Sequence, residues 1–341
     1  MMLKKTVLAC VSIVVCLLLG ELAVRLLHLA PGINRIRVDM AHGSFESSTN
    51  SVLRYVPSPG SSGISSYGIR DREYPRAKGA KTRRILVIGD SVGYGFCNDR
   101  EVLAVDDVFA KQIERACAGS GSPLEVINLC VSGYDTVQEV EFLVRKGLAL
   151  DPDVVLVAYC LNDDFEASAE LNSFQRNPQF ALESRIGRHL VLRSHLARVI
   201  WLRHAKPEAA RATAAATTTG SRTERGFERL ASLARTNGFQ PVVVVFPLFE
   251  PAASYRWHPQ HRRVSELATR FGFPVLDLFE SFALASEGDL RRLQGRCSRE
   301  HPDERGHRVA ATEIRTFLAA RGLIDAGPGG SGGGSPRVET R

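Results

Sequence analysis

The chain has 341 residues, of which 44% are apolar and 24% charged, with a net charge of +7 at pH 7. These values fit a globular protein with a substantial core and exclude a disordered or fibrous chain. The positive charge comes mostly from scattered arginines, with no block of like charges and no nucleic-acid-binding motif. We therefore expect no nucleic-acid partner.

The N-terminus has the pattern of a membrane-targeting element. Lys4 and Lys5 precede an apolar stretch that begins at Thr6 and continues to Leu29, about the ~20 residues that a bilayer requires. A removed signal peptide is one reading. An uncleaved single-pass anchor is the preferred one, because no clear A-x-A processing site follows. Residues 1–30 then hold the protein in the inner membrane with its body on the periplasmic side.

The chain has seven cysteines, and an exported location would allow them to form disulfides. Cys10 and Cys16 lie in the apolar stretch, which leaves an odd number that cannot all pair internally. No Cys-x-x-Cys spacing occurs, so a zinc or redox motif has no support. Cys130 and Cys160 end two expected strands, and they can be small buried hydrophobic residues instead of a disulfide.

The elements alternate between strands and helices along the chain. After a Ser-, Gly- and Pro-rich membrane-proximal segment at residues 31–80, short apolar runs predict five strands: 85–88, 124–129, 154–159, 241–246 and 274–278. Amphipathic patterns predict the helices between and after them: 106–118, 137–150, 222–237, 259–271 and 306–320. Repeated βα alternation predicts an α/β domain at residues 81–322 with a parallel sheet.

Two segments interrupt this pattern. Residues 164–221 are too long for a simple connection, and they combine a helical apolar pattern from Ile186 to His204 with an Ala/Thr-rich tract. They predict either a partly helical cap over the active site with a linker, or a packed surface helix unrelated to substrate choice. Residues 323–341 form a Gly/Ser-rich tail that we expect to be disordered, above all from Ala326 onward.

Four residues at the ends of these elements suggest an acyl-transfer site. Ser91 follows the first strand in a GDS motif and could be a nucleophile whose own N–H helps to bind an oxyanion. Gly133 and Asn162 follow the second and third strands and could supply two more donors. His301 precedes the closing helix and could be the general base, whereas His307 lies within that helix and is expected to be structural.

The four motifs together resemble the SGNH or GDSL hydrolases, whose name refers to Ser, Gly, Asn and His in four separate blocks. Ser91, Gly133, Asn162 and His301 match them in order, and the resemblance extends over roughly residues 52–322. It includes the lead-in SSYGIRDREYP and the end of the anchor, which look like the membrane-attached bacterial branch. The resemblance implies a flavodoxin-like three-layer αβα sandwich, serine esterase or acylhydrolase activity, and no metal or organic cofactor. It also implies that Ser91, Gly133 and Asn162 form the oxyanion hole.

The sequence departs from the family pattern at two positions. Cys160 stands where the family usually has a glycine, two residues before Asn162. Ser298 stands where the family has the carboxylate that orients the histidine, three residues before His301. We favour a Ser91–His301 dyad held by a neutral acceptor such as Ser298; Asp303 or Glu300 could instead supply the carboxylate, or the chain could be weakly active.

The preferred function is hydrolysis of a carboxylic ester through an acyl-enzyme on Ser91. By analogy, the expected substrate is an ester-bearing small molecule or an acylated glycan, such as an O-acetylated envelope or secreted polysaccharide. An O-acyltransferase would use the same site. A catalytically weak glycan-binding or envelope-assembly protein is the alternative from another functional class.

Overall fold

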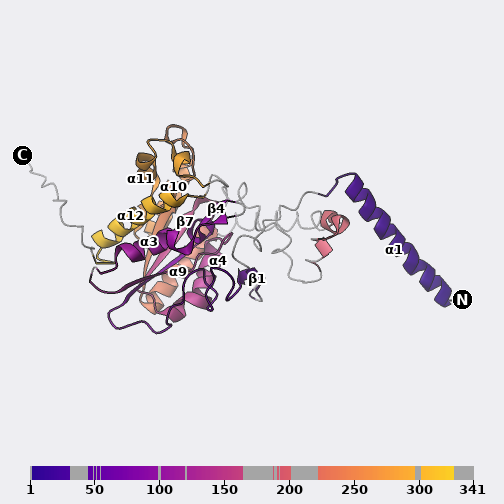
Figure 1. The fold of residues 1–341 in the computed structure, drawn as a ribbon, viewed down its shortest axis with the longest axis horizontal. Coiled ribbons are helices and arrows are strands. Elements are labelled where there is room, and N and C mark those ends of the chain that lie inside the picture. The colour runs from indigo at the N-terminus through magenta and orange to yellow at the C-terminus, as the bar shows by residue number, and fades with distance from the viewer. Residues whose placement is uncertain are drawn as a thin grey trace, which may run out of the picture.

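A computed structural model describes residues 2–30, 45–48, 50, 52–53, 55–98, 101–119, 121–163, 187, 190–191, 193–200, 222–295 and 301–325. Its centre is a five-stranded parallel sheet in the order β6-β3-β7-β8-β9 (Figure 1). The strands are β3 (Arg83–Gly89), β6 (Leu124–Asn128), β7 (Val154–Cys160), β8 (Gln240–Phe246) and β9 (Val275–Asp277). Taken in chain order, this arrangement is 2-1-3-4-5, which is the flavodoxin-like order that the resemblance implied.

The strands lie inside the molecule because they are almost wholly apolar. Ile85 to Ile88 of β3 have no exposed surface, and all seven residues of β7 are buried. A strand that is apolar on both faces requires helices on both faces. The three layers expected from the sequence are therefore confirmed.

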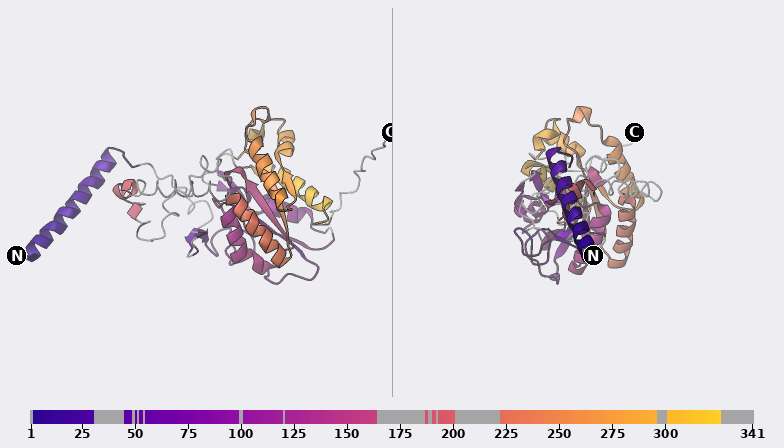
Figure 2. Two further views of the ribbon diagram at one scale, coloured as in Figure 1. Left: turned by 180° about the vertical axis from the view of Figure 1, so that it is seen from behind. Right: turned by 90° about the vertical axis from the view of Figure 1, so that its right-hand side faces the viewer.

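The helices pack in two groups. In one, α3 (Phe109–Ala116) contacts α12 (Glu304–Ala320); in the other, α4 (Thr136–Phe142) and α10 (His258–Arg270) contact α9 (Arg222–Asn237). A right-handed crossover places α3 on one face of the sheet and α4, α9 and α10 on the other, as two views show (Figure 1, Figure 2). The expected helix at 137–150 is shorter than predicted, because a wider π-turn at Leu143–Gly147 follows α4. That turn brings Gly147 against the sheet, where a Cβ would lie 3.0 Å from Leu86.

Two short helices and two pairs of short strands were not predicted. They are α2 (Ser91–Tyr94), α11 (Phe279–Ala285), the hairpin of β4 (Phe96–Asn98) with β5 (Glu101–Val102), and the pair β1 (Phe45–Ser47) with β2 (Tyr55–Pro57). Each is too short for its hydrophobic pattern to be distinguished from that of a loop.

The hydrophobic core begins before residue 81, the expected start of the domain. Tyr55, Ile64 and Ile69 are buried in the same cluster as the sheet. Asp71 forms a buried ion pair with Lys111 of α3 at 2.9 Å. At the other end Ile324 is also buried, so the fold reaches at least two residues past the expected domain end at residue 322.

The N-terminal helix α1 (Met2–Leu26) projects away from the sheet and its helices (Figure 2). Within the described residues, Lys4–Leu26 is the one helical segment long and apolar enough to cross a membrane, a test that a signal sequence also passes. Its apolar side chains are exposed along its length, as a lipid-facing helix requires. Of the expected insertion at 164–221, only residues 187, 190–191 and 193–200 are described, and the cap over the active site lies outside the described residues.

Candidate active site

Ser91 lies at the carboxyl end of β3, as the sequence predicted. Asp90 caps α2 by accepting a hydrogen bond from the Val92 N–H at 2.9 Å, and Ser91 is only 8% exposed. Two glycines allow this turn to pack closely. A Cβ on Gly89 would lie 2.9 Å from the Ala158 carbonyl oxygen, and a Cβ on Gly93 would lie 2.2 Å from the Cys130 sulfur.

His301 lies beside Ser91, although 210 residues separate them in the sequence. Its Nε2 is 2.8 Å from the Ser91 Oγ, within hydrogen-bond distance. The segment that carries it is fixed by backbone bonds: the Gly295 N–H donates to the His301 carbonyl and the Asp303 N–H donates to the Leu293 carbonyl, each at 2.8 Å. The imidazole therefore comes from a short loop that is held in place directly before α12.

Burial lowers the pKa of His301 to about 4. The ring is thus neutral at pH 7, and a neutral Nε2 that accepts the Ser91 proton requires the hydrogen to be on Nδ1. Asp90 is a second acceptor for the same hydroxyl, at the longer distance of 3.3 Å. The shorter contact favours proton transfer to His301.

The Asp303 carboxylate is used by the helix that follows it. It accepts hydrogen bonds from the Gly306 N–H and from the Arg305 guanidinium, both at 2.9 Å. These bonds stabilise the first turn of α12 and do not involve the His301 ring. Ser298 and Glu300, the other two candidates for orienting His301, lie outside the described residues.

Gly133 and Asn162 follow β6 and β7 at the same edge of the sheet as Ser91. Gly133 has φ of 77°, a left-handed conformation that favours glycine. The Tyr55 hydroxyl donates to the Ser132 carbonyl at 2.6 Å and so holds this loop. Asn162 lies in the 3₁₀ turn Leu161–Asp163, and the placement of its side chain is outside the description.

A buried pair of carboxyl groups lies behind the candidate nucleophile, and the sequence did not indicate it. Glu139 and Asp163 are 2% and 3% exposed, and the negative charge of Asp163 acts on Glu139. Among the described residues no N–H or O–H donates to either Glu139 oxygen, whereas the Thr136 hydroxyl donates to Asp163 at 3.1 Å. A buried carboxylate that receives no hydrogen bond is costly, so burial and the neighbouring charges favour the protonated form of Glu139.

The pKa values of this pair have the same explanation. Burial, followed by the negative charges of Asp163, Asp90 and Asp135, raises the pKa of Glu139 well above its ordinary value. Burial likewise raises that of Asp163. Asp135, by contrast, is paired with Arg222 at 2.6 Å. In the sequence, Glu139 is indistinguishable from a solvent-exposed helical glutamate.

Three other residues considered in the sequence have structural surroundings. Cys130 and Cys160 are buried and form no disulfide with each other, which confirms their expected role as small hydrophobic residues. His307 is fully buried and its Nδ1 accepts a hydrogen bond from the Phe109 N–H at 3.3 Å, so it joins α12 to α3. Burial lowers its pKa to about 3.

A histidine–carboxylate pair occurs at the end of β9. The His261 Nδ1 lies 2.8 Å from Asp277, and its Nε2 lies 2.7 Å from the Tyr255 hydroxyl. That hydroxyl also accepts a hydrogen bond from the Leu248 N–H at 3.0 Å, and Tyr255 is 6% exposed. We interpret the group as a buried link between β8, α10 and β9.

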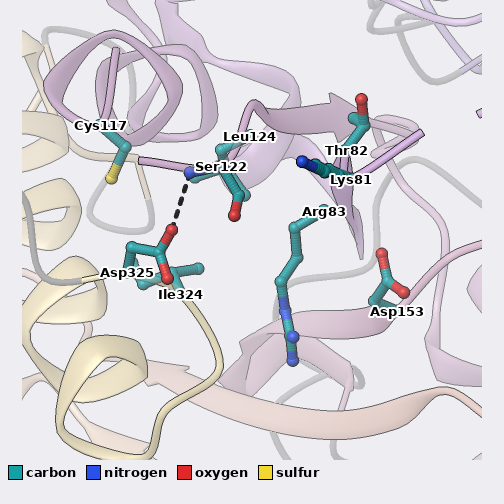
Figure 3. Close-up of a pocket in the computed structure, with 9 residues that line it drawn as sticks. All are labelled: Lys81, Thr82, Arg83, Cys117, Ser122, Leu124, Asp153, Ile324 and Asp325. Atoms are coloured by element: carbon teal, nitrogen blue, oxygen red, sulfur yellow. Dashed lines mark hydrogen bonds between the residues drawn. The ribbon is translucent and has the colours of Figure 1, made fainter. Parts of the chain in front are cut away.

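A cavity of about 200 Å³ lies at the opposite edge of the sheet, near the amino ends of β3 and β6 (Figure 3). Lys81, Thr82 and Arg83 line it together with Ser122, whose N–H donates to Asp325 at 2.9 Å. Ser91 and His301 do not line it. The cavity is therefore separate from the candidate active site.

Comparison with known proteins identifies the family. The GDSL-like lipase/acylhydrolase family matches residues 87–309, which include Ser91, Gly133, Asn162 and His301. The chain belongs to this family and is a carboxylic ester hydrolase. No curated protein matches.

Solved structures similar to this chain include three enzymes. An α/β hydrolase from the metagenome of Lake Arreo is 14% identical, with a TM-score of 0.47 over 72% of this chain and 97% of that one. A lipase/acylhydrolase from Enterococcus faecalis is 18% identical, with a TM-score of 0.42 over 70% and 96%. A catalytic mutant of an acetylxylan esterase from Geobacillus stearothermophilus is 15% identical, with a TM-score of 0.45 over 72% and 97%. At these values the similarities carry no conclusion about the substrate.

Proposed function

We propose that this chain is a membrane-anchored serine esterase that acts outside the cytoplasm and cleaves esters through an acyl-enzyme on Ser91. The observation that carries the proposal is the 2.8 Å contact between His301 Nε2 and Ser91 Oγ. Membership of the GDSL-like family supports ester hydrolysis. The apolar helix α1, which has Lys4 and Lys5 near its start, supports an anchor with a cytoplasmic N-terminus, in the inner membrane of the cell.

The proposed reaction assigns a role to each of these groups. The Ser91 oxygen attacks the ester carbonyl carbon while its proton passes to His301 Nε2. The oxyanion that forms is stabilised by the N–H groups of Ser91 and Gly133 and by the Asn162 side chain, each worth about 3 kcal/mol in the transition state. His301 returns the proton to the departing alcohol, and a water molecule then cleaves the acyl-enzyme by the reverse route.

We propose O-acetyl groups on an envelope or secreted polysaccharide as the substrate. Membrane attachment and the basic composition support an acidic or envelope-associated partner. Transfer of the acyl group to a sugar hydroxyl in place of water is the alternative outcome at the same acyl-enzyme.

The test combines one substitution with one labelling reagent. Ser91→Ala should lower p-nitrophenyl acetate turnover by a factor on the order of 10⁴ or more and abolish labelling by a fluorophosphonate, since the nucleophile is lost. Ser286→Ala, which changes a buried serine directly after α11, is the matched control and should keep both. Unchanged turnover in Ser91→Ala would refute the mechanism. Acetyl transfer to an added sugar that exceeds hydrolysis would identify a transferase.

A further inference from the structure

The one carboxylate in the apolar helix makes contacts with a distant segment of the chain. Glu21 is the sole acidic residue between Lys4 and Leu26. Its carboxylate accepts hydrogen bonds from the Ser194 hydroxyl at 2.8 Å and from the N–H groups of His195 and Leu196 at 3.0 and 2.9 Å. These contacts join the N-terminal helix to the insertion that follows β7.

The contact satisfies both partners. A carboxylate in an apolar helix is costly next to lipid, and here it receives three donors together with the Arg25 guanidinium at 2.6 Å. Residues 195–200 are helical, and the first N–H groups of a helix have no partner within it, so Glu21 supplies the acceptor that they need. A Cβ on Gly20 would lie 3.1 Å from Leu196, which shows how closely the segments approach. Figure 1 shows residues 193–200 beside the end of α1.

The segments around this contact have exposed apolar side chains and a basic sequence. Leu26, Leu27 and Leu29 of the N-terminal segment are exposed, as are Leu190 and Ile200 of the insertion. From Arg185 to Lys206 the sequence has five arginines, one lysine and no acidic residue. Exposed leucine and isoleucine in an arginine-rich stretch of sequence is the composition of segments that lie in the interface of an anionic bilayer.

The insertion leaves and re-enters the fold at the active-site edge. It follows Asp163, next to Asn162, and returns at Thr223, whose hydroxyl donates to the Asp163 carbonyl at 3.3 Å. The segment after α1 enters at the same edge, because the Phe45 ring lies 5.7 Å from the ring of Tyr94 in α2. Three chain connections therefore lead from the edge that carries Ser91 to the end of α1.

We propose that α1 is retained and that residues 193–200, clamped to it by Glu21, form a second contact with the surface of an anionic phospholipid bilayer. This arrangement turns the Ser91 edge of the sheet toward the bilayer, so the esters within reach are those displayed at the membrane surface. The inference rests on the proposed function in one respect, that α1 spans the membrane. It adds a lipid-binding surface and an orientation of the active site.

Photocrosslinking of the full-length protein in vesicles of phosphatidylcholine and phosphatidylglycerol tests this. A p-benzoylphenylalanine at Ile200 should crosslink to phospholipid, whereas the same probe at Leu284, which is 84% exposed on α11, should not. Glu21→Ala should reduce crosslinking at Ile200 by about fivefold or more, because the clamp is lost. Ser12→Ala is the control on the same helix, since this hydroxyl bonds only the Leu8 carbonyl, and it should leave crosslinking unchanged.

The outcomes separate this inference from the proposed function. A probe at Leu8 reports whether α1 is retained in the bilayer, and fluorophosphonate labelling of Ser91 reports the esterase. Crosslinking at Leu8 without crosslinking at Ile200 would overturn the second membrane contact alone. Unchanged crosslinking at Ile200 in Glu21→Ala would overturn the clamp. Absence of crosslinking at Leu8 would refute both the retained anchor and the membrane part of the proposed function.

Discussion

At the residue scale, one proton on Ser91 decides the proposed chemistry. His301 Nε2 at 2.8 Å and Asp90 at 3.3 Å both accept it, and the shorter contact leads to the group that can pass a proton on to a leaving alcohol. Asp90 also accepts the Val92 N–H at 2.9 Å, so its carboxylate is partly used as a helix cap. The imidazole is therefore the base that the geometry favours.

The pH dependence of kcat/KM should report the low pKa of His301. Only the neutral ring can accept the Ser91 proton, so activity is lost as the pH falls through the pKa, which burial lowers to about 4. We expect half-maximal kcat/KM for p-nitrophenyl acetate near pH 4 and a plateau at neutral pH. Half-maximal activity at the ordinary histidine value of 6.5 would show that a carboxylate supports the ring after all.

Ser298→Asp is the matched variant for this profile, because it restores a carboxylate at the family's usual position. If that position faces His301, the new negative charge raises the pKa of the ring and shifts the acid limb to higher pH, with turnover retained or increased. Loss of activity in a folded Ser298→Asp protein would indicate that another group already orients His301.

The buried Glu139–Asp163 pair should make the protein less stable as pH rises. The folded-state pKa of Glu139 lies above its ordinary value of 4.5, so its contribution to stability is present below that value and is lost as pH rises toward the folded-state pKa. The glutamine side chain of Glu139→Gln has the shape of a protonated carboxyl group and can donate a hydrogen bond, but it cannot ionise. Between the ordinary and the folded-state pKa of Glu139, the free energy of unfolding of the parent should fall relative to that of the variant. The difference should grow by up to about 1.4 kcal/mol per pH unit.

Urea unfolding of both proteins at several pH values measures this difference. Glu228→Gln provides the control, since this glutamate lies on the surface of α9. Parallel pH profiles for Glu139→Gln and the parent would mean that the buried pair is not protonated.

At the element scale, the loop that carries Gly133 is held by a hydroxyl from another segment. Tyr55 donates to the Ser132 carbonyl at 2.6 Å. Tyr67 donates to the Lys146 carbonyl at 2.8 Å, and Lys146 belongs to none of the four motifs. Tyr55→Phe and Tyr67→Phe each remove one such hydrogen bond and should each cost about 1 kcal/mol of stability. Only Tyr55→Phe should also lower kcat, by about tenfold, because the Gly133 N–H is then less well placed for the oxyanion.

Measurement of kcat and of the free energy of unfolding on both variants separates the two effects. Equal losses of kcat in Tyr55→Phe and Tyr67→Phe, or none in either, would argue against a role for this loop in catalysis.

The long elements could be predicted from the sequence because their hydrophobic patterns are strong. The strand expected at 154–159 is observed at Val154–Cys160, and the helix expected at 222–237 is observed at Arg222–Asn237. The short elements α2 and α11 depend on tertiary contacts, and no local pattern distinguishes them. The protonation of Glu139 likewise depends on Asp163, which lies in another element, so no inspection of its own helix could reveal it.

For the candidate site, four motifs in order were enough to indicate Ser91, Gly133, Asn162 and His301. Sequence could not indicate that Asp303 is used by α12, because a carboxylate two residues after a histidine fits both a helix cap and a catalytic partner. It could not indicate the role of Glu21 either, since the donors at 194–196 lie far along the chain.

At the scale of the whole molecule, the 2-1-3-4-5 order of the sheet brings distant motifs to one edge. The segments after β3, β6 and β7 meet there, and the loop before α12 adds His301 from the C-terminal end of the domain. The connections to α1 also start at this edge. In the proposed arrangement the chemistry and the membrane attachment share one side of the fold, as would suit an enzyme whose substrate is at the membrane surface.

The central claim is that the Ser91 oxygen becomes acylated with His301 as its base. Acid quenching of the full-length protein during turnover of p-nitrophenyl acetate, followed by peptide mass spectrometry, tests it most directly. The account predicts an acetyl group on the peptide that contains Ser91, absent in Ser91→Ala and strongly reduced in His301→Ala. Acetylation confined to another residue, or an unchanged yield of the Ser91 adduct in His301→Ala, would contradict it.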